Sequence, residues 1–424
     1  MGNLDYTQVL NKIENTRRFG NEPGVVVTAQ VIKVLREKGK QKRIIPYIHV
    51  AGTNGKGSVC AFFSSILKKE HMRVGTFVSP HLVDFEERIT VDGRMIPKED
   101  VTRLGNYLLD IDFGIGLTMF DYCLAMALLY FEEQQCDYMV IETGLGGRLD
   151  STNAIGTPQC AVITKIGYDH MAILGSDIAD IAAEKAGIIK ENGTVVVEQQ
   201  DKRAMQVIEQ EAQKKHARII TVEQSDIARC SGYALRLCGT FQWENAAAAE
   251  LAARYVLGKR YGWPEYEMQN DKTEPKREGT DLNKRIKSAL EEAVWPGRME
   301  IVSKEPFLLV DGAHNSNGVD ALKESLMQMY PGEKFCFFMG VMADKDYDVM
   351  IREILPLAEE FYTVTPDSDR ALQASHLADF IRKEGVKATE LSGVDEIRRH
   401  LKRNTKNVAF GSLYFIGEIK QHRI

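Results

Sequence analysis

Residues 52–58 read GTNGKGS, a combination of residue types that binds phosphate groups. Glycines allow a tight turn and bring backbone N–H groups close to phosphate oxygens. Lys56 would reach the terminal phosphates of a nucleotide, and Ser58 could bind Mg²⁺ or a phosphate oxygen. The spacing is shorter than the usual GxxxxGK[ST], because Val50 stands where that pattern needs glycine. The alternative is a Gly-rich turn with a solvated lysine. The expected nucleotide contacts are Gly52, Thr53, Asn54, Gly55, Lys56, Gly57 and Ser58.

Three further polar residues have side chains that bind divalent cations. Ser79, Glu142 and His170 each follow an apolar run of strand length. The carboxyl ends of parallel strands form the edge at which α/β sheets bind ligands. A hydroxyl, a carboxylate and an imidazole, together with phosphate oxygens and water, could form an octahedral shell for Mg²⁺ or Mn²⁺. Alternatively, Ser79 caps a helix before Pro80, and His170 is an ordinary loop or capping residue.

Lys185 is predicted to lie on the apolar face of a helix. The helix would begin after Ser176 or Asp177, and Lys185 follows Ile178 by seven positions, on the same face. Burial lowers the pKa of an ammonium group, and a neutral amine can react with CO₂ to form a carbamate, which can bind metal. The alternative is a lysine whose ammonium extends past the core to a nearby carboxylate.

Apolar runs of strand length alternate with helix-period segments along the chain. One series lies at residues 44–52, 73–79, 138–144, 161–167 and 193–199, and a second at 307–313, 334–340, 360–366 and 407–412. Continuous apolar strands between helices predict parallel sheets covered on both faces. We therefore predict two α/β domains, at residues 1–296 and 297–424. The polar, aperiodic segment 258–285 is predicted to be an exposed insertion ahead of a short helix.

The composition is typical of a soluble globular protein. The chain has 424 residues, enough for two ordinary domains, and a formal net charge of −6. This charge argues against binding to nucleic acid through a large cationic surface. The sequence contains neither a long apolar run nor an N-terminal secretory signal, so we expect a cytoplasmic protein that does not bind membranes. The seven cysteines include no CxxC pair and are expected to be reduced. We expect a monomer.

Several segments, taken together, resemble one known family. They are GTNGKGS (52–58), SPHLVDFEERI (79–89), ETGLGGRLDSTN (142–153), EKAGIIK (184–190), FQWEN (241–245), WPGRME (295–300), DGAHN (311–315) and FGSLYFIGE (410–418). In this order they are similar to segments of the folylpolyglutamate synthase and dihydrofolate synthase family, part of the Mur ligase superfamily. The resemblance implies a P-loop, parallel-sheet ATP-binding N-terminal domain and a smaller, Rossmann-like C-terminal glutamate ligase domain.

The resemblance also implies roles for individual residues. It assigns Ser79, Glu142, His170 and a carbamylated Lys185 to two Mg²⁺ ions. The ATP contacts that it adds are Asn245, Arg298, Asp311 and His314, and the catalytic residues that it implies are Lys56, His170, Lys185 and Arg298. The substrate contacts carried over are Arg88, Phe120, Asp121, Asp150 and Ser412. The family often has Glu where this chain has Asp121, a change that could alter the pterin contact. For Phe120 the alternative is simple core packing.

The reaction implied is ATP-dependent addition of L-glutamate to a folate through an acyl phosphate, with dihydropteroate left open as a second acceptor. Three alternatives compete. A cell-wall Mur ligase would need an additional N-terminal substrate domain of about 100 residues, and few residues precede this phosphate loop. A P-loop ATPase switch leaves DGAHN and WPGRME without a role. A catalytically silent folate-binding protein does not explain why Lys56, Glu142, His170 and Lys185 are all present.

Overall fold

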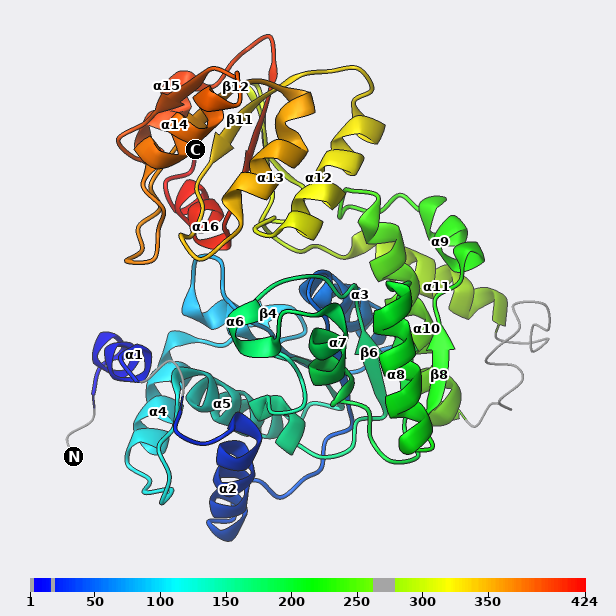
Figure 1. The fold of residues 1–424 in the computed structure, drawn as a ribbon. Coiled ribbons are helices and arrows are strands. Elements are labelled where there is room, and N and C mark those ends of the chain that lie inside the picture. Colours follow the sequence, from blue (N-terminus) through cyan, green and yellow to red (C-terminus); the bar gives the residue numbers. More distant parts are fainter. Residues whose placement is uncertain (1–3, 17–19, 262–278) are drawn as a thin grey trace. The chain divides into compact units, whose positions relative to one another are not determined.

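The computed structural model describes residues 4–16, 20–261 and 279–424 (Figure 1). Contacts divide the chain into two compact units. The first contains Met1–His81, Phe85–Ala234 and Glu244–Ala293, and the second contains Leu82–Asp84, Leu235–Trp243 and Val294–Ile424. The units therefore differ from the predicted ranges 1–296 and 297–424 in three short segments, all of which join the second unit.

The first unit is built on an eight-stranded sheet with the order β4-β3-β2-β5-β1-β6-β7-β8. Its strands are β1 (Tyr47–Ala51), β2 (Val74–Phe77), β3 (Ile89–Val91), β4 (Arg94–Met95), β5 (Tyr138–Glu142), β6 (Cys160–Ile163), β7 (Thr194–Val197) and β8 (Arg218–Thr221). The strands from β2 to β8 in this order are parallel, whereas β3 and β4 are antiparallel. The predicted parallel sheet is confirmed, and each apolar run of the first series overlaps one of its strands.

Helices cover both faces of this sheet. They are α1 (Tyr6–Glu14), α2 (Gly24–Glu37), α3 (Lys56–Lys69), α4 (Lys98–Leu109), α5 (Met119–Glu133), α6 (Met171–Leu174), α7 (Ile178–Ala186), α8 (Lys202–Lys214), α9 (Gln224–Ser231), α10 (Phe241–Tyr261) and α11 (Gly279–Glu292), with the 3-10 helices η1 (Phe85–Arg88) and η2 (Ser151–Ala154). Successive strand residues point to opposite faces. Met139 packs into the core formed with α2 and α5, whereas Tyr138 lies against Phe63 of α3, with ring centroids 5.9 Å apart.

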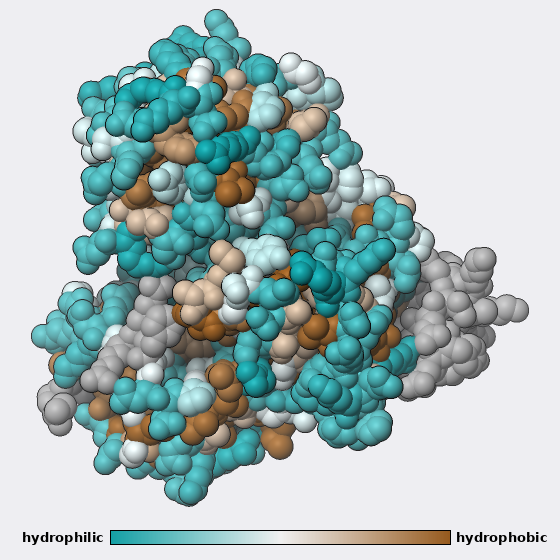
Figure 2. Space-filling model, in the orientation of Figure 1, coloured by the Kyte–Doolittle hydropathy of each residue, from teal (hydrophilic) through white to brown (hydrophobic). Residues whose placement is uncertain are grey.

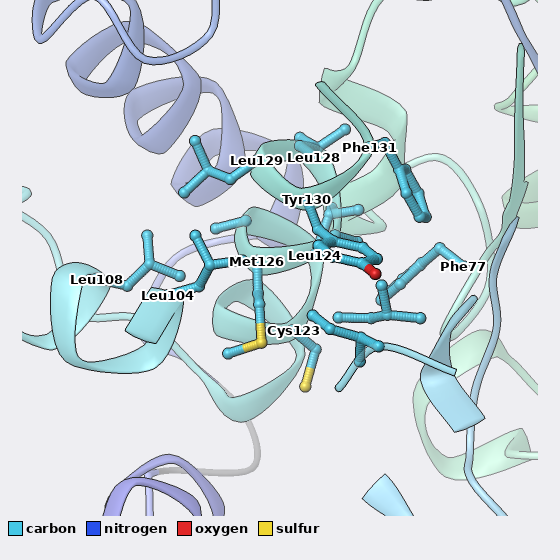
Figure 3. Packing of buried hydrophobic residues seen from close by; sticks show 14 of the residues in the cluster. Phe77, Leu104, Leu108, Cys123, Leu124, Met126, Leu128, Leu129, Tyr130 and Phe131 are labelled. Atoms are coloured by element: carbon cyan, nitrogen blue, oxygen red, sulfur yellow. The ribbon is translucent and has the colours of Figure 1, made fainter. Parts of the chain in front are cut away.

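Helix α5 is apolar around most of its circumference and is therefore buried. Leu124 and Leu128 of α5 belong to the same core as Leu104 and Leu108 of α4 (Figure 3). Helix α5 packs tightly on the sheet at Gly75 of β2, where an added Cβ would lie 2.5 Å from the ring of Phe131. This packing fixes the N-terminus of α5, which carries two of the predicted substrate residues.

The predicted insertion at residues 258–285 is helical at both described ends. Helix α10 continues to Tyr261, and α11 begins at Gly279. Leu282 and Ile286 of α11 are buried, and Ser65 of α3 donates to the carbonyl oxygen of Ala289, at 2.7 Å. The expectation of an exposed segment therefore does not hold for this part of α11. Residues 262–278 lie outside the described residues.

The second unit contains a six-stranded sheet with the order β13-β12-β11-β14-β10-β9. The strands are β9 (Glu300–Lys304), β10 (Phe307–Val310), β11 (Phe335–Met339), β12 (Ala358–Thr363), β13 (Ala388–Glu390) and β14 (Lys406–Phe410). All neighbouring pairs are parallel except β9 with β10. The second apolar series predicts the parallel strands β10, β11, β12 and β14, whereas β9 and β13 were not predicted.

Helices also cover both faces of the second sheet (Figure 1). They are α12 (Ser316–Met329), α13 (Tyr347–Ile354), α14 (Ala374–Lys383), α15 (Ile397–His400) and α16 (Leu413–Gln421), with the 3-10 helices η3 (Leu355–Leu357) and η4 (Val394–Glu396). Phe337 of β11 packs in the core with α12 and α13, and its neighbour Phe338 packs with α16 on the other face. None of the helices within the described ranges is long and apolar enough to span a membrane, and hydrophilic residues cover most of the face shown in Figure 2.

Candidate active site

The phosphate loop joins β1 to α3 and requires glycine at two positions. Gly52 and Gly55 have φ values of 154° and 92°, which residues with a side chain rarely adopt. An added Cβ on Gly52 would lie 1.9 Å from Oγ1 of Thr164, and one on Gly55 would lie 2.3 Å from Oδ1 of Asn245. The loop is therefore packed closely against Thr164 and Asn245, two residues that are distant in the sequence.

The backbone amides of this loop divide into two groups. The N–H groups of Thr53 and Asn54 donate to the carbonyl oxygen of Lys165, at 2.9 and 3.2 Å. The first N–H groups of α3, which begins at Lys56, have no acceptor within the helix. A phosphate would therefore bind at the helix N-terminus, where these N–H groups and the helix dipole favour an anion.

Two lysines converge on one backbone carbonyl of the loop. The Nζ of Lys56 donates to the carbonyl oxygens of Gly52 and Thr53, at 3.1 and 3.2 Å. The Nζ of Lys185 donates to the same Gly52 oxygen, at 2.8 Å. Lys56 also lies 4.0 Å from Oε1 of Glu142. Cationic groups thus gather at the point where the phosphates of a nucleotide would bind.

Lys185 is buried near the C-terminus of α7, whose N-cap is Asp177. Burial, assisted by the nearby Lys56 ammonium and opposed by Asp169 and Asp150, lowers the pKa of Lys185 to about 7. A substantial fraction of this amine is therefore neutral near neutral pH. Asp169, which the sequence reasoning did not single out, has a side chain that is only 8% exposed. Asp169 directly precedes His170 in the segment KIGYDH (165–170), and this position is the sequence feature that could have identified it.

The predicted metal-binding residues lie near the carboxyl edge of the first sheet. Glu142 is the last residue of β5 and is buried, and its Oε2 accepts a hydrogen bond from the backbone N–H of Ser79, at 3.2 Å. His170 is the N-cap of α6, and its backbone N–H donates to Oδ1 of Asp169, at 2.8 Å. Within the described ranges, no group of three or more His, Cys, Asp or Glu side chains is arranged to hold a metal ion.

The donors that are present nevertheless fit Mg²⁺ in one common arrangement. In nucleotide sites this ion is usually bound by one or two carboxylates, with phosphates and water completing its shell. The Glu142 carboxylate and the adjacent Ser79 supply oxygen donors of this kind. The chemistry of this pair therefore suits a magnesium ion bound together with a nucleotide.

Two predicted substrate residues have aromatic and cationic side chains. The ring of Phe120 packs edge-to-face against Phe77, with centroids 5.4 Å apart, and an added Cβ on Gly144 would lie 2.7 Å from it. Arg88 is buried at the end of η1, and its Nε lies 2.8 Å from Nδ1 of His81. Packing accounts for much of the Phe120 environment, and a substrate role for both residues stays a prediction.

Asp121 is surrounded by donors from its own chain. Its Oδ2 accepts from the N–H and the hydroxyl of Thr118, at 2.9 and 2.6 Å. Its Oδ1 accepts from the hydroxyls of Ser151, at 2.6 Å, and Thr28, at 3.4 Å. The carboxylate therefore joins α5 to η2 and α2, and these contacts explain its burial without any substrate.

We expect Asp121→Asn to destabilise the fold. The carboxylate accepts hydrogen bonds at both oxygens, whereas the NH₂ group of asparagine would face an N–H or hydroxyl donor and could not accept from it. The free energy of unfolding should fall by about 1–3 kcal/mol, measured by urea denaturation. Asp112→Asn is the matched control, since Asp112 accepts only a local bond from Gly114 among the bonds described, at an exposed site. A higher KM for folate with unchanged stability would instead support a substrate contact.

Asp150 similarly holds the backbone around it. Its Oδ2 accepts from the N–H groups of Gly144 and Leu145, at 2.9 and 2.8 Å. Its Oδ1 accepts from the N–H of Thr152, at 2.9 Å, and from the Thr152 hydroxyl. Burial raises the pKa of Asp150, and these hydrogen bonds offset only part of the rise. Asp150 thus fixes the loop that follows Glu142, and a direct substrate contact by it stays a prediction.

The predicted nucleotide residues of the second unit lie in two adjoining turns. Asp311 accepts from the N–H groups of Met299 and Ala313, both at 2.8 Å. An added Cβ on Gly312 would lie 2.4 Å from Nη1 of Arg298. Burial raises the pKa of Asp311, and the Arg298 charge opposes this. Asp311 therefore positions the backbone next to Arg298.

Two more predicted residues of this unit have local partners. Nδ1 of His314 lies 2.7 Å from the carbonyl oxygen of Gly312. Ser412 is the N-cap of α16, and its hydroxyl accepts from the N–H of Tyr414, at 3.1 Å. These contacts place both side chains at the carboxyl edge of the second sheet, beside strands β10 and β14.

Comparisons with known proteins agree with this fold and site. The family model described as Mur ligase middle domain matches residues 50–253, and the one described as Mur ligase, glutamate ligase domain matches residues 297–409. The chain is thus an ATP-dependent ligase of the Mur type. A protein of Bacillus subtilis (strain 168) named dihydrofolate synthase/folylpolyglutamate synthase is 33% identical, over 98% of each chain. The chain therefore belongs to the folylpolyglutamate synthase/dihydrofolate synthase family, as its motifs predict.

Solved structures show the same architecture. Mycobacterium tuberculosis folylpolyglutamate synthase complexed with ADP has a TM-score of 0.83 at 24% identity, covering 99% of this chain and 98% of that one, a likeness that concerns the fold alone. Escherichia coli FolC in complex with DHPP and ADP has a TM-score of 0.80 at 26% identity, covering 99% of this chain and 97% of that one. The two-domain α/β prediction is confirmed.

Proposed function

We propose that this chain uses ATP to form an amide bond between a folate carboxyl group and the amino group of L-glutamate. The observation that carries the proposal is the convergence of Lys56 and Lys185 on the Gly52 carbonyl, beside the buried Glu142. The names of the relatives support the substrates, and the ADP in the two solved structures supports the nucleotide.

The chemistry explains the need for a nucleotide. A carboxylate is a poor acyl donor because its leaving group would be oxide. Transfer of the γ-phosphoryl group of ATP gives an acyl phosphate, which the glutamate amine attacks, releasing phosphate. Phosphoryl transfer depends mainly on positioning and on neutralising charge. Lys56 and the N-terminus of α3 would do both on the nucleotide, and Arg298 would add positive charge.

We further propose that Mg²⁺ binds with the nucleotide at Ser79, Glu142 and His170. The ion would supply positive charge that balances the phosphate oxygens. Lys185 is proposed to carry a carbamate that helps to hold a second ion. The buried position of its Nζ and the lowered pKa support this, because only the neutral amine reacts with CO₂. We propose that the enzyme acts as a monomer.

The first test is the dependence of phosphate release on the acceptors. With Mg²⁺ and ATP, purified protein should release phosphate only when glutamate is supplied together with a folate or dihydropteroate. Parallel glutamate-incorporation assays on tetrahydrofolate and dihydropteroate would decide whether the chain has one or both of the activities in the names of its relatives. Phosphate release without either acceptor would indicate an ATPase switch, and no release under any condition would indicate a silent binder.

A further inference from the structure

His49 is a fully buried histidine on an inner strand of the first sheet. It lies in β1, beside Ile141 of β5 and Ala161 of β6, three residues before Gly52. Its Nε2 lies 2.7 Å from Oγ1 of Thr152, and its Nδ1 has no hydrogen-bond partner among the residues that the structure describes. An imidazole in this position is costly to bury compared with an aliphatic side chain, so a functional reason is worth seeking.

The hydrogen bonds determine which ring nitrogen carries the proton. The carboxylate of Asp150 accepts four hydrogen bonds, and one of them comes from the Thr152 hydroxyl. Since that hydroxyl proton is committed to Asp150, Thr152 Oγ1 accepts from His49, and Nε2 is the protonated nitrogen. Burial lowers the pKa of His49 to about 3, and nearby Lys190 acts in the same direction. The ring is therefore a neutral donor throughout the working pH range.

This chain of hydrogen bonds ends on the loop that follows Glu142. From His49 it passes through Thr152 to Asp150, and from there to the N–H groups of Gly144 and Leu145. Only Thr143 separates Glu142 from the first of these amides. The β1–β5 ladder already pairs Glu142 with Val50, and the N–H of Thr143 donates to the Val50 carbonyl oxygen, at 2.9 Å. The hydrogen-bond chain from His49 adds a second tie between β1 and the loop that begins at Gly144.

The same loop also holds the helix that carries Lys185. The N–H of Arg148 donates to the carbonyl oxygen of Glu184, at 2.7 Å. An added Cβ on Gly147 would lie 2.8 and 2.9 Å from the carbonyl oxygens of Glu184 and Lys185. A shift of residues 144–150 would therefore move Glu142 and Lys185 relative to each other and to the phosphate loop.

We propose that His49 is a positioning residue, which through Thr152 and Asp150 fixes the separation of Glu142 and Lys185 beside the phosphate loop. This role in the reaction rests on the proposed function. A displacement of about 1 Å can lower a rate on the order of 100-fold, so the hydrogen-bond chain can matter without touching substrate.

The test compares variants that keep or remove the donor. His49→Met removes it with little change in length, and Thr152→Val removes the acceptor. Each should lower kcat by about tenfold or more, while the Kd for ADP stays within about threefold, because the Lys165 carbonyl holds the loop amides independently. His49→Gln retains a donor near the Nε2 position and should recover most of kcat. The double variant His49→Met/Thr152→Val should be no slower than the worse single variant, since both break one chain.

Hydrogen exchange gives a readout that does not depend on activity. The amides of Gly144 and Leu145 should exchange faster in His49→Met and Thr152→Val, and at the wild-type rate in His49→Gln. Thr194→Val is the matched control, because it removes a buried Thr194–Tyr255 hydrogen bond of 2.8 Å at the first residue of β7. This variant should change neither kcat nor the exchange rates of the Gly144 and Leu145 amides.

The outcomes separate the two proposals. Unchanged amide exchange in both His49→Met and Thr152→Val would overturn the positioning role, as would full kcat in both. An equal loss of kcat in His49→Met and His49→Gln would also overturn it. If the wild-type protein incorporates no glutamate, but the two amides still exchange faster in His49→Met and Thr152→Val than in wild type, the proposed function is refuted. The hydrogen-bond chain would then still stand.

Discussion

Replacing Lys56 with alanine is expected to abolish turnover and to leave the fold intact. At hydrogen-bond distance, the described contacts of the Lys56 ammonium are the Gly52 and Thr53 carbonyl oxygens of its own loop, so its removal breaks no such bond to another element. These contacts hold the charge next to the N-terminus of α3, where a phosphate would bind. Loss of one preorganised charge at a developing transition state costs on the order of 10³-fold in kcat.

The comparison with Lys69→Ala makes this test specific. Lys69 is the last residue of the same helix, and it pairs with Glu292 at the surface, at 2.7 Å. Surface ion pairs of this kind contribute about 0–1 kcal/mol, so that variant should retain both activity and stability. Glutamate incorporation, ADP binding and thermal unfolding would be measured on both variants. Turnover by Lys56→Ala within about threefold of wild type would refute the assignment of Lys56 to the phosphates.

The strands that the sequence predicts are those with continuous apolar runs. β1 and β11 are buried on both faces and therefore show no alternation with polar residues. The short antiparallel β3 and β4 were not predicted, because two or three residues give no recognisable period. The four residues of β8 are all only half-buried at the sheet edge, so their apolar pattern is weak.

The sequence of α11 shows apolar residues at helical spacing, but the many charged residues around them obscure this pattern. Leu282, near the end of the predicted insertion, is buried in α11. It shares helical spacing with the buried Ile286, Ala289 and Leu290, which follow the insertion where a short helix was predicted. The charged residues between them led to the expectation of an exposed segment. They lie on the outer face of an amphipathic helix, which is a common arrangement for a helix packed against a domain.

The candidate site was predictable where the chemistry lies on one element. Glycines followed by a lysine at a strand–helix junction predict a phosphate loop, and helical spacing predicts that Lys185 lies on the apolar face of a helix, where α7 has it buried. The contacts of Asp121 could not be predicted, since its partners Ser151 and Thr28 lie 30 and 93 positions away. The link between His49 and Thr152 spans 103 positions and depends equally on the folded topology.

Lys185→Ala is expected to lose most activity and to regain part of it when small carboxylates are added. If the lysine acts as a carbamate, alanine removes both the negative charge and the chain that carries it. The truncation also leaves space in a buried site, which formate or acetate could enter. Activity should therefore rise with the concentration of the added carboxylate, measured as glutamate incorporation at fixed ionic strength.

The unmodified amine has a separate signature in the pH dependence of stability. The pKa of Lys185 is lowered to about 7 from 10.5, so between these values the unfolded chain binds more protons than the folded one. In CO₂-free buffer, the free energy of unfolding should therefore rise with pH across this window and be lowest below it. Lys185→Met removes this contribution, and the variant should be the more stable protein near pH 7, by a difference that shrinks toward pH 10.5.

Methionine at this position is also the control for the rescue. Lys185→Met lacks the carbamate as Lys185→Ala does, but its side chain fills the space of the lysine stem. Added formate should therefore rescue the alanine variant and leave the methionine variant inactive, because only the former has room for the anion. Equal rescue of both variants would point to a general effect of the salt. Full activity of Lys185→Met without additive would show that neither a carbamate nor the lysine itself is needed, and the second metal ion would then lose its proposed ligand.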